Sequence, residues 1–305
     1  LGKAVAQGGA SIINTCIGWH EARVPTIATS VPRGAFAWVT QKMKAEFAAA
    51  GIATPLVTSN RINTPEVAEG VLADGSADMV SMARPFLADP DFVRKARQGR
   101  ADEINTCIAC NQACLDHTFS GKLTSCLVNP RACHETELAY TPAVIPKRVA
   151  VVGAGPAGMM TAIVAAGRGH KVTLFDKAAQ VGGQLNLAKR VPGKEEFHGL
   201  VDWFATMLRA RGITLRLGHQ ATVEDVAGFD EVVVATGVIP RNPGIPTEAG
   251  ARVLSYIDIL QGADAGRRVA VVGAGGIGFD VSEYLTHEGT SPSIDAPKFY
   301  AEWGI

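Results

Sequence analysis

One string of residues occurs twice in this chain and constrains its fold more than any other feature. The string Arg148-Val-Ala-Val-Val-Gly-Ala-Gly155 recurs letter for letter at residues 268–275. In each copy an apolar run leads directly into a glycine-rich turn. This order is typical of a β-strand followed by the tight loop and helix of a nucleotide-binding βα unit. The repeat therefore predicts an α/β fold with two such units.

The glycines of the first copy have distinct expected roles. Gly153 would allow the tight turn, Gly155 would let a pyrophosphate approach the backbone, and Gly158 would let the helix pack closely against the strand. Asp176 ends the next predicted strand, where its carboxylate could accept hydrogen bonds from a ribose diol. An acidic residue at a strand end is otherwise an ordinary solvated residue. With strand, helix and acid in register, the pattern predicts dinucleotide binding.

Three further glycine motifs support a flavoprotein with two dinucleotide sites. The second fingerprint supplies Gly273, Gly275 and Gly278. Gly182-Gly183-Gln184 follows the first unit, and Ala235-Thr-Gly237 closes a predicted strand at 231–235. These last two motifs could equally be plain turns. Taken with both fingerprints, they predict FAD on the first loop and a nicotinamide nucleotide on the second.

Residues 1–100 alternate predicted strands with predicted helices. The strands are expected at 10–14, 55–59 and 78–82, and the helices at 34–50, 65–74 and 91–98. Strands separated by helices of this length predict a parallel sheet. Since no dinucleotide fingerprint accompanies them, the C-terminal part of a (β/α)8 TIM barrel is the better prediction than a Rossmann domain.

Charged side chains follow the ends of these predicted barrel strands. Arg61 and Arg84 come after the second and third strands, where barrels often build a phosphate site. An arginine is usually a solvated surface residue, but a pair at equivalent strand ends would suit a flavin phosphate. His20 follows the first strand, in the stretch Gly18-Trp-His-Glu-Ala-Arg23. Its position at that end of the barrel makes it a candidate functional histidine, although a lone histidine is more often structural.

A cysteine-rich segment, residues 101–140, separates the two regions. Its four closely spaced cysteines are Cys107, Cys110, Cys114 and Cys126. Thiolates in such a cluster suit zinc or iron–sulfur. Structural zinc sites favour paired C-x2-C motifs, whereas three crowded cysteines and a distant fourth suit the corners of a 4Fe–4S cluster. Zinc, and a disulfide or structural role, are the alternatives. Cys133 is a rival fourth ligand, but simple packing is the default for Cys16 and Cys133.

Composition gives no indication of a nucleic-acid or membrane partner. Lysine plus arginine and aspartate plus glutamate both total 29, and 47% of the residues are hydrophobic. Residues 149–167 carry no charge and are long enough to cross a bilayer, but their glycines and Pro156 divide them into a strand, a turn and a helix. A disulfide is disfavoured because nothing suggests an oxidising compartment. We therefore expect a cytoplasmic protein.

Taken together, these motifs resemble the bacterial-type 2,4-dienoyl-CoA reductases, within the old yellow enzyme-like family of iron–sulfur flavoproteins. The resemblance covers essentially the whole chain. The motifs that carry it, besides the glycine loops, are Gly18-Trp-His-Glu-Ala-Arg23, Ser59-Asn-Arg-Ile62, Ser81-Met-Ala-Arg-Pro85, Cys107-Ile-Ala-Cys-Asn-Gln-Ala-Cys114 and Ser125-Cys-Leu-Val-Asn-Pro-Arg131.

The resemblance implies an activity and a set of cofactors. In such enzymes NADPH reduces FAD, single electrons pass through a 4Fe–4S cluster to FMN, and FMN delivers hydride to the dienoyl thioester during the oxidation of unsaturated fatty acids. A flavin on either side of a one-electron carrier suits a nicotinamide that gives two electrons at once. NADH is an alternative donor. The partner would be the small-molecule acyl-CoA substrate, with no nucleic acid and no membrane, and the oligomeric state is left open.

The resemblance also implies roles for individual residues. It makes the four cysteines the cluster ligands and makes His20 the group that works near the thioester carbonyl. It places Arg61 and Arg84 with FMN. The residues that it places with FAD are Ala157, Asp176, Gln184 and Val223.

The predicted organisation has four parts, cut at both ends relative to the family. They are the barrel part at 1–100, the cluster segment at 101–140, the FAD-binding domain at 141–265 and the start of a nicotinamide-binding domain at 266–305. The family's proton-donor tyrosine would lie upstream of Leu1, and Cys16 stands where the family favours glycine. Alternatives are an amine dehydrogenase or enoate reductase of the same build, a non-enzymatic electron carrier, and a zinc-stabilised binding module.

Overall fold

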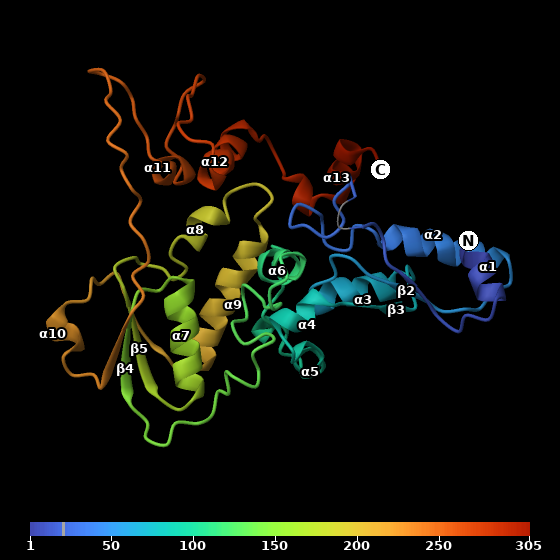
Figure 1. Ribbon diagram of the computed structural model, residues 1–305, viewed down its shortest axis with the longest axis horizontal. Coiled ribbons are helices and arrows are strands. Elements are labelled where there is room, and N and C mark those ends of the chain that lie inside the picture. Colours follow the sequence, from blue (N-terminus) through green and yellow to red (C-terminus); the bar gives the residue numbers. More distant parts are fainter. Residues whose placement is uncertain (20–21) are drawn as a thin grey trace. The chain divides into compact units, whose positions relative to one another are not determined.

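The computed structural model describes residues 1–19 and 22–305 (Figure 1). The chain divides into two compact units. Unit 1 comprises Leu1–Leu138 together with Gly289–Ile305, and unit 2 comprises Ala139–Glu288. Each unit contains one parallel sheet. The predicted α/β class is therefore confirmed.

The sheet of unit 1 has the strand order β1-β2-β3, and all of its pairs are parallel. The strands are β1 (Ile13–Thr15), β2 (Leu56–Thr58) and β3 (Met79–Val80). β2 is buried throughout because it lies between the other two. Each strand falls at a predicted position, although β1 begins later than the predicted strand at 10–14. The carboxyl ends of all three strands lie at one edge of the sheet, because parallel strands run in the same direction.

Helices connect these strands, as the sequence predicts. Those of unit 1 before its cysteine segment are α1 (Gly2–Gln7), α2 (Ala37–Ala49), α3 (Pro65–Ala73), α4 (Arg84–Ala88) and α5 (Phe92–Arg97). The start of α3 shows why a helix begins there. The Thr64 side chain accepts a hydrogen bond from the Val67 amide at 3.3 Å, and Pro65 occupies the first turn, where a missing N–H costs nothing.

The C-terminal segment of the chain packs within unit 1. After the short turn η3 (Pro292–Ile294) comes α13 (Ala296–Trp303), which begins at the capping side chain of Asp295. Phe299 of this helix is fully buried in a cluster with Val31 and Phe36, and its ring meets Phe36 edge to face at 6.4 Å. Burial of this large ring explains why residues 289–305 belong to unit 1.

Unit 2 has a four-stranded parallel sheet with the order β6-β5-β4-β7. Its strands are β4 (Arg148–Val152), β5 (Lys171–Asp176), β6 (Thr214–Leu217) and β7 (Glu231–Val234). The central strand β4 is apolar and has fully buried Ala150 and Val151. The strands predicted at 171–176 and 231–235 are confirmed to within one residue.

Two long helices pack together in unit 2, α7 (Pro156–Gly167) and α9 (Glu196–Ala210) (Figure 1). α7 also packs against β4 and β5. α9 buries one apolar face, which includes Leu200, Phe204 and Leu208. The remaining helices are α8 (Leu185–Ala188), α10 (Val223–Val226), α11 (Tyr256–Leu260) and α12 (Gly276–Thr286).

The second copy of the repeat folds only in part. Its glycine turn leads into α12, as predicted, but residues 268–272 are not a strand. Val269, Val271 and Val272 are exposed. A strand requires a neighbour to satisfy its backbone groups, and no strand in the described residues pairs with this run.

The predicted four-part organisation remains a prediction. The two compact units place residues 289–305 with unit 1, whereas the sequence predicts a nicotinamide domain over 266–305. The difference follows from the burial of Phe299. Over residues 1–19 and 22–305, no helix is both long enough and apolar enough to cross a bilayer.

Candidate functional site

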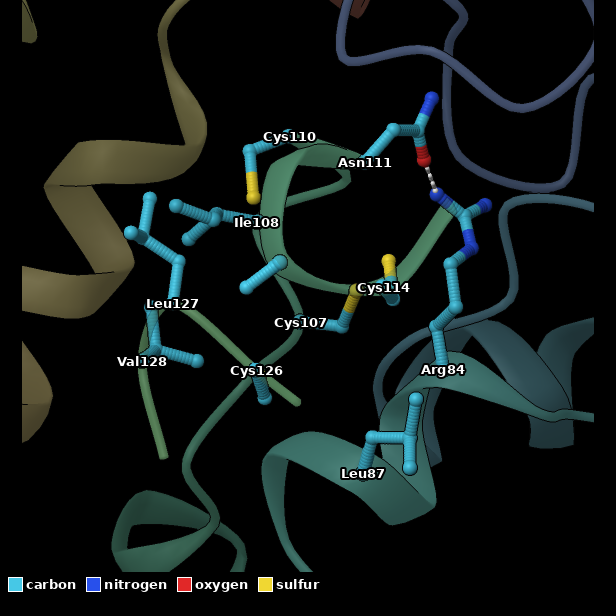
Figure 2. A pocket seen from close by; sticks show the side chains of 11 residues that line it. Arg84, Leu87, Cys107, Ile108, Cys110, Asn111, Cys114, Cys126, Leu127 and Val128 are labelled. Carbon is cyan, nitrogen blue, oxygen red and sulfur yellow. Dashed lines mark hydrogen bonds between the residues drawn. The ribbon is translucent and has the colours of Figure 1, made fainter. Parts of the chain in front are cut away.

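The first three cysteines of the cysteine segment lie on one tightly wound loop of unit 1 (Figure 2). Ala109 and Asn111 both have positive φ, at 54° and 61°. Two left-handed residues so close together turn the chain back on itself. The loop then enters the π-helical turn η2 (Gln112–Asp116), which carries Cys114 and continues into α6 (His117–Phe119).

All four predicted ligands line one pocket, Cys107, Cys110, Cys114 and Cys126. The structure thus brings Cys126 to the other three across the intervening turn. Neither Cys16 nor Cys133 lines this pocket, and both are exposed. The remaining lining residues are Arg84, Leu87, Ile108, Asn111, Ala113, Leu127 and Val128. The pocket is therefore lined by sulfur, aliphatic groups, one amide side chain and one cation.

Backbone amides point at three of these sulfurs. The Ala109 N–H donates to Cys107 Sγ at 3.4 Å. Cys110 accepts in the same way from Gln112, and Cys126 accepts from Val128 and Asn129. In each case one donor lies two residues after the cysteine. Amide donors of this kind stabilise a thiolate, and hydrogen bonds to the sulfurs are one means of tuning an iron–sulfur cluster.

Burial has the opposite effect on these thiols. It raises the pKa of Cys107, Cys110 and Cys126, that of Cys126 to about 11, because a buried thiolate has lost its hydration. The thiolate form therefore needs a bound cation at neutral pH. A metal centre supplies such a charge and deprotonates its cysteine ligands.

The donor set of the pocket fits the predicted cluster, because four cysteine thiols line one cavity. Four cysteines with amide donors around one pocket are the donors that such a cluster uses. Within the part of the chain that the structure describes, no group of three or more His, Cys, Asp or Glu side chains is arranged to hold a metal ion, so the cluster stays a prediction.

A buried polar network supports the cysteine loop. Asn63, after β2, donates from Nδ2 to the Cys107 carbonyl at 2.8 Å. Asp89 accepts from the Asn105 amide at 2.9 Å and from Lys95 Nζ at 2.6 Å, both through Oδ2. Asn105 in turn donates to the Val128 carbonyl at 2.7 Å. These side chains tie both cysteine-bearing stretches to the barrel part, and the sequence patterns do not reveal them.

The two predicted phosphate-binding arginines have protein partners. Arg61 is 4% exposed and donates from Nε to the Val31 carbonyl at 2.8 Å. Arg84, the first residue of α4, donates from Nη1 to the Ile27 carbonyl at 2.8 Å and to Asn111 Oδ1 at 2.5 Å. Both follow neighbouring strands of the parallel sheet, as predicted. Their assignment to FMN stays a prediction.

His20 lies outside the described residues, so its predicted role is untested. Trp19, beside it in sequence, is 63% exposed. Gly18 has φ of 73°, and a Cβ there would lie 2.2 Å from the Thr26 side chain. Glycine is therefore required where the chain leaves β1 and approaches the His20 stretch.

In unit 2 the first glycine loop has the geometry that its sequence predicts. A Cβ at Gly153 would lie 2.2 Å from the Ala235 carbonyl oxygen, and one at Gly158 would lie 1.8 Å from the Gly153 carbonyl oxygen. A Cβ at Gly155, by contrast, would meet nothing within 4 Å. Open space at the start of α7 is what an approaching pyrophosphate needs, because the helix N-terminus offers amide donors.

Asp176 and Gln184 both make contacts near this loop. Asp176 accepts from the Ala154 amide at 2.6 Å, which joins the end of β5 to the glycine turn. Gln184 accepts from the Tyr256 hydroxyl at 3.2 Å. A Cβ at Gly183 would lie 3.0 Å from Gly155 Cα, so the Gly182–Gln184 turn lies against the loop.

The other predicted nucleotide residues are less constrained. Ala157 is exposed in the first turn of α7. Val223 begins α10 and is 77% exposed. In the second loop a Cβ at Gly278 would lie 2.1 Å from the Gly273 carbonyl oxygen, whereas Gly275 faces open space. The second loop thus repeats the first, although no strand precedes it.

Comparison with known sequences defines the class. Residues 3–103 match the NADH:flavin oxidoreductase / NADH oxidase family, and residues 147–294 match the pyridine nucleotide-disulphide oxidoreductases. The chain thus combines a part of the old yellow enzyme-like NADH:flavin oxidoreductases with a pyridine nucleotide-disulphide oxidoreductase domain. The barrel identity of residues 1–100 and the use of flavin and nicotinamide nucleotides follow from these families.

Individual relatives carry several different names. A metal reductase of Desulforamulus reducens is 41% identical over 94% of this chain and 43% of its own length. An NADH oxidase of Thermoanaerobacter brockii is 34% identical over 96% of this chain and 46% of its own length. The structure of a 2-naphthoyl-CoA reductase in complex with 2-naphthoyl-CoA is 29% identical, with a TM-score of 0.84 over 99% of this chain and 49% of that chain. The chain spans less than half the length of these relatives.

Proposed function

We propose that this chain is part of an NADPH-dependent 2,4-dienoyl-CoA reductase that contains FAD, FMN and one 4Fe–4S cluster. The observation that carries the proposal is the cysteine pocket, where the four cysteines of the spacing motif meet beside Arg84. An electron-transfer centre in the segment that links the barrel part to the dinucleotide unit in the sequence would explain why one chain carries all three parts. The similarity to a reductase named for a CoA thioester supports a thioester substrate.

The residues of unit 1 would hold two of the cofactors. The cluster would supply one-electron transfer, with Cys107, Cys110, Cys114 and Cys126 as its ligands. Their amide donors would stabilise the thiolates, and the aliphatic lining would exclude water. Arg61 and Arg84 follow adjacent strand ends, which is where a barrel binds phosphate, so they are assigned to the FMN phosphate.

The residues of unit 2 would hold FAD. The Gly155 backbone and the first turn of α7, including Ala157, would face the pyrophosphate. Asp176 would accept hydrogen bonds from a ribose diol, and Gln184 and Val223 would contact the remainder of the molecule. The second loop, with Gly273, Gly275 and Gly278, is assigned to NADPH, with NADH as the alternative.

His20 is assigned to the substrate. It follows β1 in the sequence, and we assign it to a role near the thioester carbonyl, where it would aid proton delivery. Loss of a positioned acid of this kind lowers turnover by roughly 10²–10⁴-fold. His20→Gln should therefore lower kcat for the thioester and leave the flavin and iron content unchanged.

The test is a spectral titration of the whole protein, purified without oxygen. NADPH should bleach the flavin absorbance, and a 2,4-dienoyl-CoA should restore it. If the dienoyl-CoA does not restore the absorbance but an enoate does, the thioester substrate is rejected in favour of enoate reduction. If a tertiary amine bleaches the oxidised protein without NADPH, the flavin takes electrons from the amine, and the protein is an amine dehydrogenase instead. Iron and acid-labile sulfide near zero would reject the cluster, and zinc in their place would support the structural alternative.

A further inference from the structure

Arg84 makes a side-chain contact that a flavin-phosphate role does not explain. Its Nη1 donates to Asn111 Oδ1 at 2.5 Å and to the Ile27 carbonyl at 2.8 Å (Figure 2). Within the described residues, Nη2 and Nε of Arg84 have no protein partner. One edge of the guanidinium is thus held by the protein, and the rest remains available to an anion.

Asn111 is suited to hold this contact. It lies on the cysteine loop, directly after Cys110, and its φ is 61°. Asparagine tolerates the left-handed conformation better than most residues. The same residue therefore shapes the backbone between Cys110 and Cys114 and offers its side-chain oxygen to Arg84.

The contact places a permanent positive charge at the pocket. Arg84 lines the pocket together with all four cysteines, and Figure 2 shows its side chain reaching the loop from α4. The arginine guanidinium is always charged in proteins. A fixed cation in a poorly solvated pocket favours the more negative state of whatever it faces, and charge and hydrogen bonding set the potential of iron–sulfur centres.

We propose that Asn111 is a positioning residue that holds the Arg84 guanidinium at the cysteine pocket and thereby raises the reduction potential of the bound cluster. The inference rests on the proposed function and deepens it. It assigns Arg84 two neighbours, the flavin phosphate on its open side and the cluster loop on its anchored side. It assigns Asn111 a role distinct from that of a ligand.

The test is an anaerobic redox titration of the whole protein, with the reduced cluster followed by electron paramagnetic resonance. Asn111→Gly removes the acceptor but keeps a backbone that adopts positive φ without strain. Its midpoint potential should shift to a more negative value, with iron content retained. Arg94→Gln is the matched control, because Arg94 lies on α5, is exposed and forms an ion pair with Asp91. Its potential should match that of the parent.

A double variant tests whether Asn111 acts through Arg84. Arg84→Gln should lower the potential on its own, and adding Asn111→Gly should produce no further shift. Additive shifts, or an unchanged potential in Asn111→Gly with full iron content, would overturn the inference. If the Asn111→Gly protein loses its iron, the inference is tested by Arg84→Gln alone. An unchanged cluster potential in the Arg84→Gln protein would then overturn the inference. A parent protein without iron would instead reject the proposed function.

Discussion

Asn63 donates a hydrogen bond from Nδ2 to the carbonyl oxygen of Cys107, at 2.8 Å. This bond joins the loop after the central barrel strand β2 to the first cysteine of the pocket. Asn63 is 2% exposed, so water cannot replace the contact. The barrel part and the cysteine segment are therefore packed together, and a substitution in the barrel part should change the stability of the cysteine loop.

Replacing Asn63 should loosen the cysteine loop without removing a ligand. Asn63→Ala leaves the Cys107 carbonyl without its donor, and a lost buried hydrogen bond of this kind costs about 1–3 kcal/mol. We expect iron to be released faster to a chelator than in the parent. Asn14→Ala is the control, because Asn14 also lies in unit 1 but its side chain makes a long, exposed hydrogen bond to Ser81, at 3.3 Å. Equal release rates in the two variants would contradict this role.

The assignment of the fourth cysteine can be tested against its rival. Cys126→Ser should abolish the iron–sulfur absorbance, because Cys126 lines the pocket with the other three cysteines. Cys133→Ser should leave that absorbance unchanged, because Cys133 is exposed and lies outside the pocket. The measurement is iron and acid-labile sulfide per chain after anaerobic purification. The reverse pattern would make Cys133 the ligand.

Two alanine substitutions in the first glycine loop should have different effects, one on stability and the other on FAD binding. Gly158→Ala would place a Cβ 1.8 Å from the Gly153 carbonyl oxygen, so it should disrupt the packing of α7 on the sheet and lower the melting temperature. Gly155→Ala meets nothing within 4 Å, so it should leave the melting temperature of the flavin-free protein unchanged. It should nevertheless weaken FAD binding, because the added methyl group fills the space that the pyrophosphate needs. Normal FAD content in Gly155→Ala would move the dinucleotide elsewhere.

The contribution of Asp78 to the free energy of unfolding should not change with pH near neutrality. Its carboxylate accepts from the Leu56 amide at 2.9 Å and pairs with Lys44 at 2.7 Å. The Leu56 amide, followed by Lys44, lowers the pKa of Asp78 below its ordinary value. A lowered folded-state pKa means that the stabilisation is complete above the unfolded pKa and is lost only as pH falls through the folded pKa.

The matching variant is Asp78→Ala, measured by urea unfolding. It should lower the free energy of unfolding by about 1 kcal/mol, since a typical hydrogen bond contributes that much and the exposed ion pair adds little. The difference from the parent should be the same at pH 6 and at pH 8. Both pH values lie well above the ordinary carboxylate pKa of about 4. A difference that changes across this interval would mean that another group titrates with Asp78.

The C-terminal helix should be essential to unit 1. Phe299 is fully buried against Val31 and Phe36, and the neighbouring Tyr300 hydroxyl donates to the Ala35 carbonyl. Phe299→Ala should lower the free energy of unfolding by about 3–5 kcal/mol. Phe299→Leu, which keeps most of the volume, should cost less. Thermal unfolding of both variants measures the difference, and equal, negligible losses would show that the helix is dispensable.

Short-range patterns account for what the sequence alone determined. The glycines at 153 and 158 were predictable because their steric requirements arise within one turn. Most strands and helices were predictable because alternating apolar runs and capping residues act over a few positions. The cysteine spacing indicated for the same reason that three of the cysteines share one loop, whereas the 4Fe–4S cluster stays a prediction. The run at 268–272 shows the limit of such patterns, because an identical string forms a strand only where a neighbouring strand pairs with it.

Tertiary structure alone decided which distant residues meet. Nothing near Asn63 or Asn111 indicates that they bind Cys107 and Arg84, because each contact depends on how separate loops converge at the ends of parallel strands. The same holds for Phe299, whose burial returns the end of the chain to unit 1 from far along the sequence. Local sequence sets conformational preference, whereas burial and long-range hydrogen bonds depend on the assembled sheet.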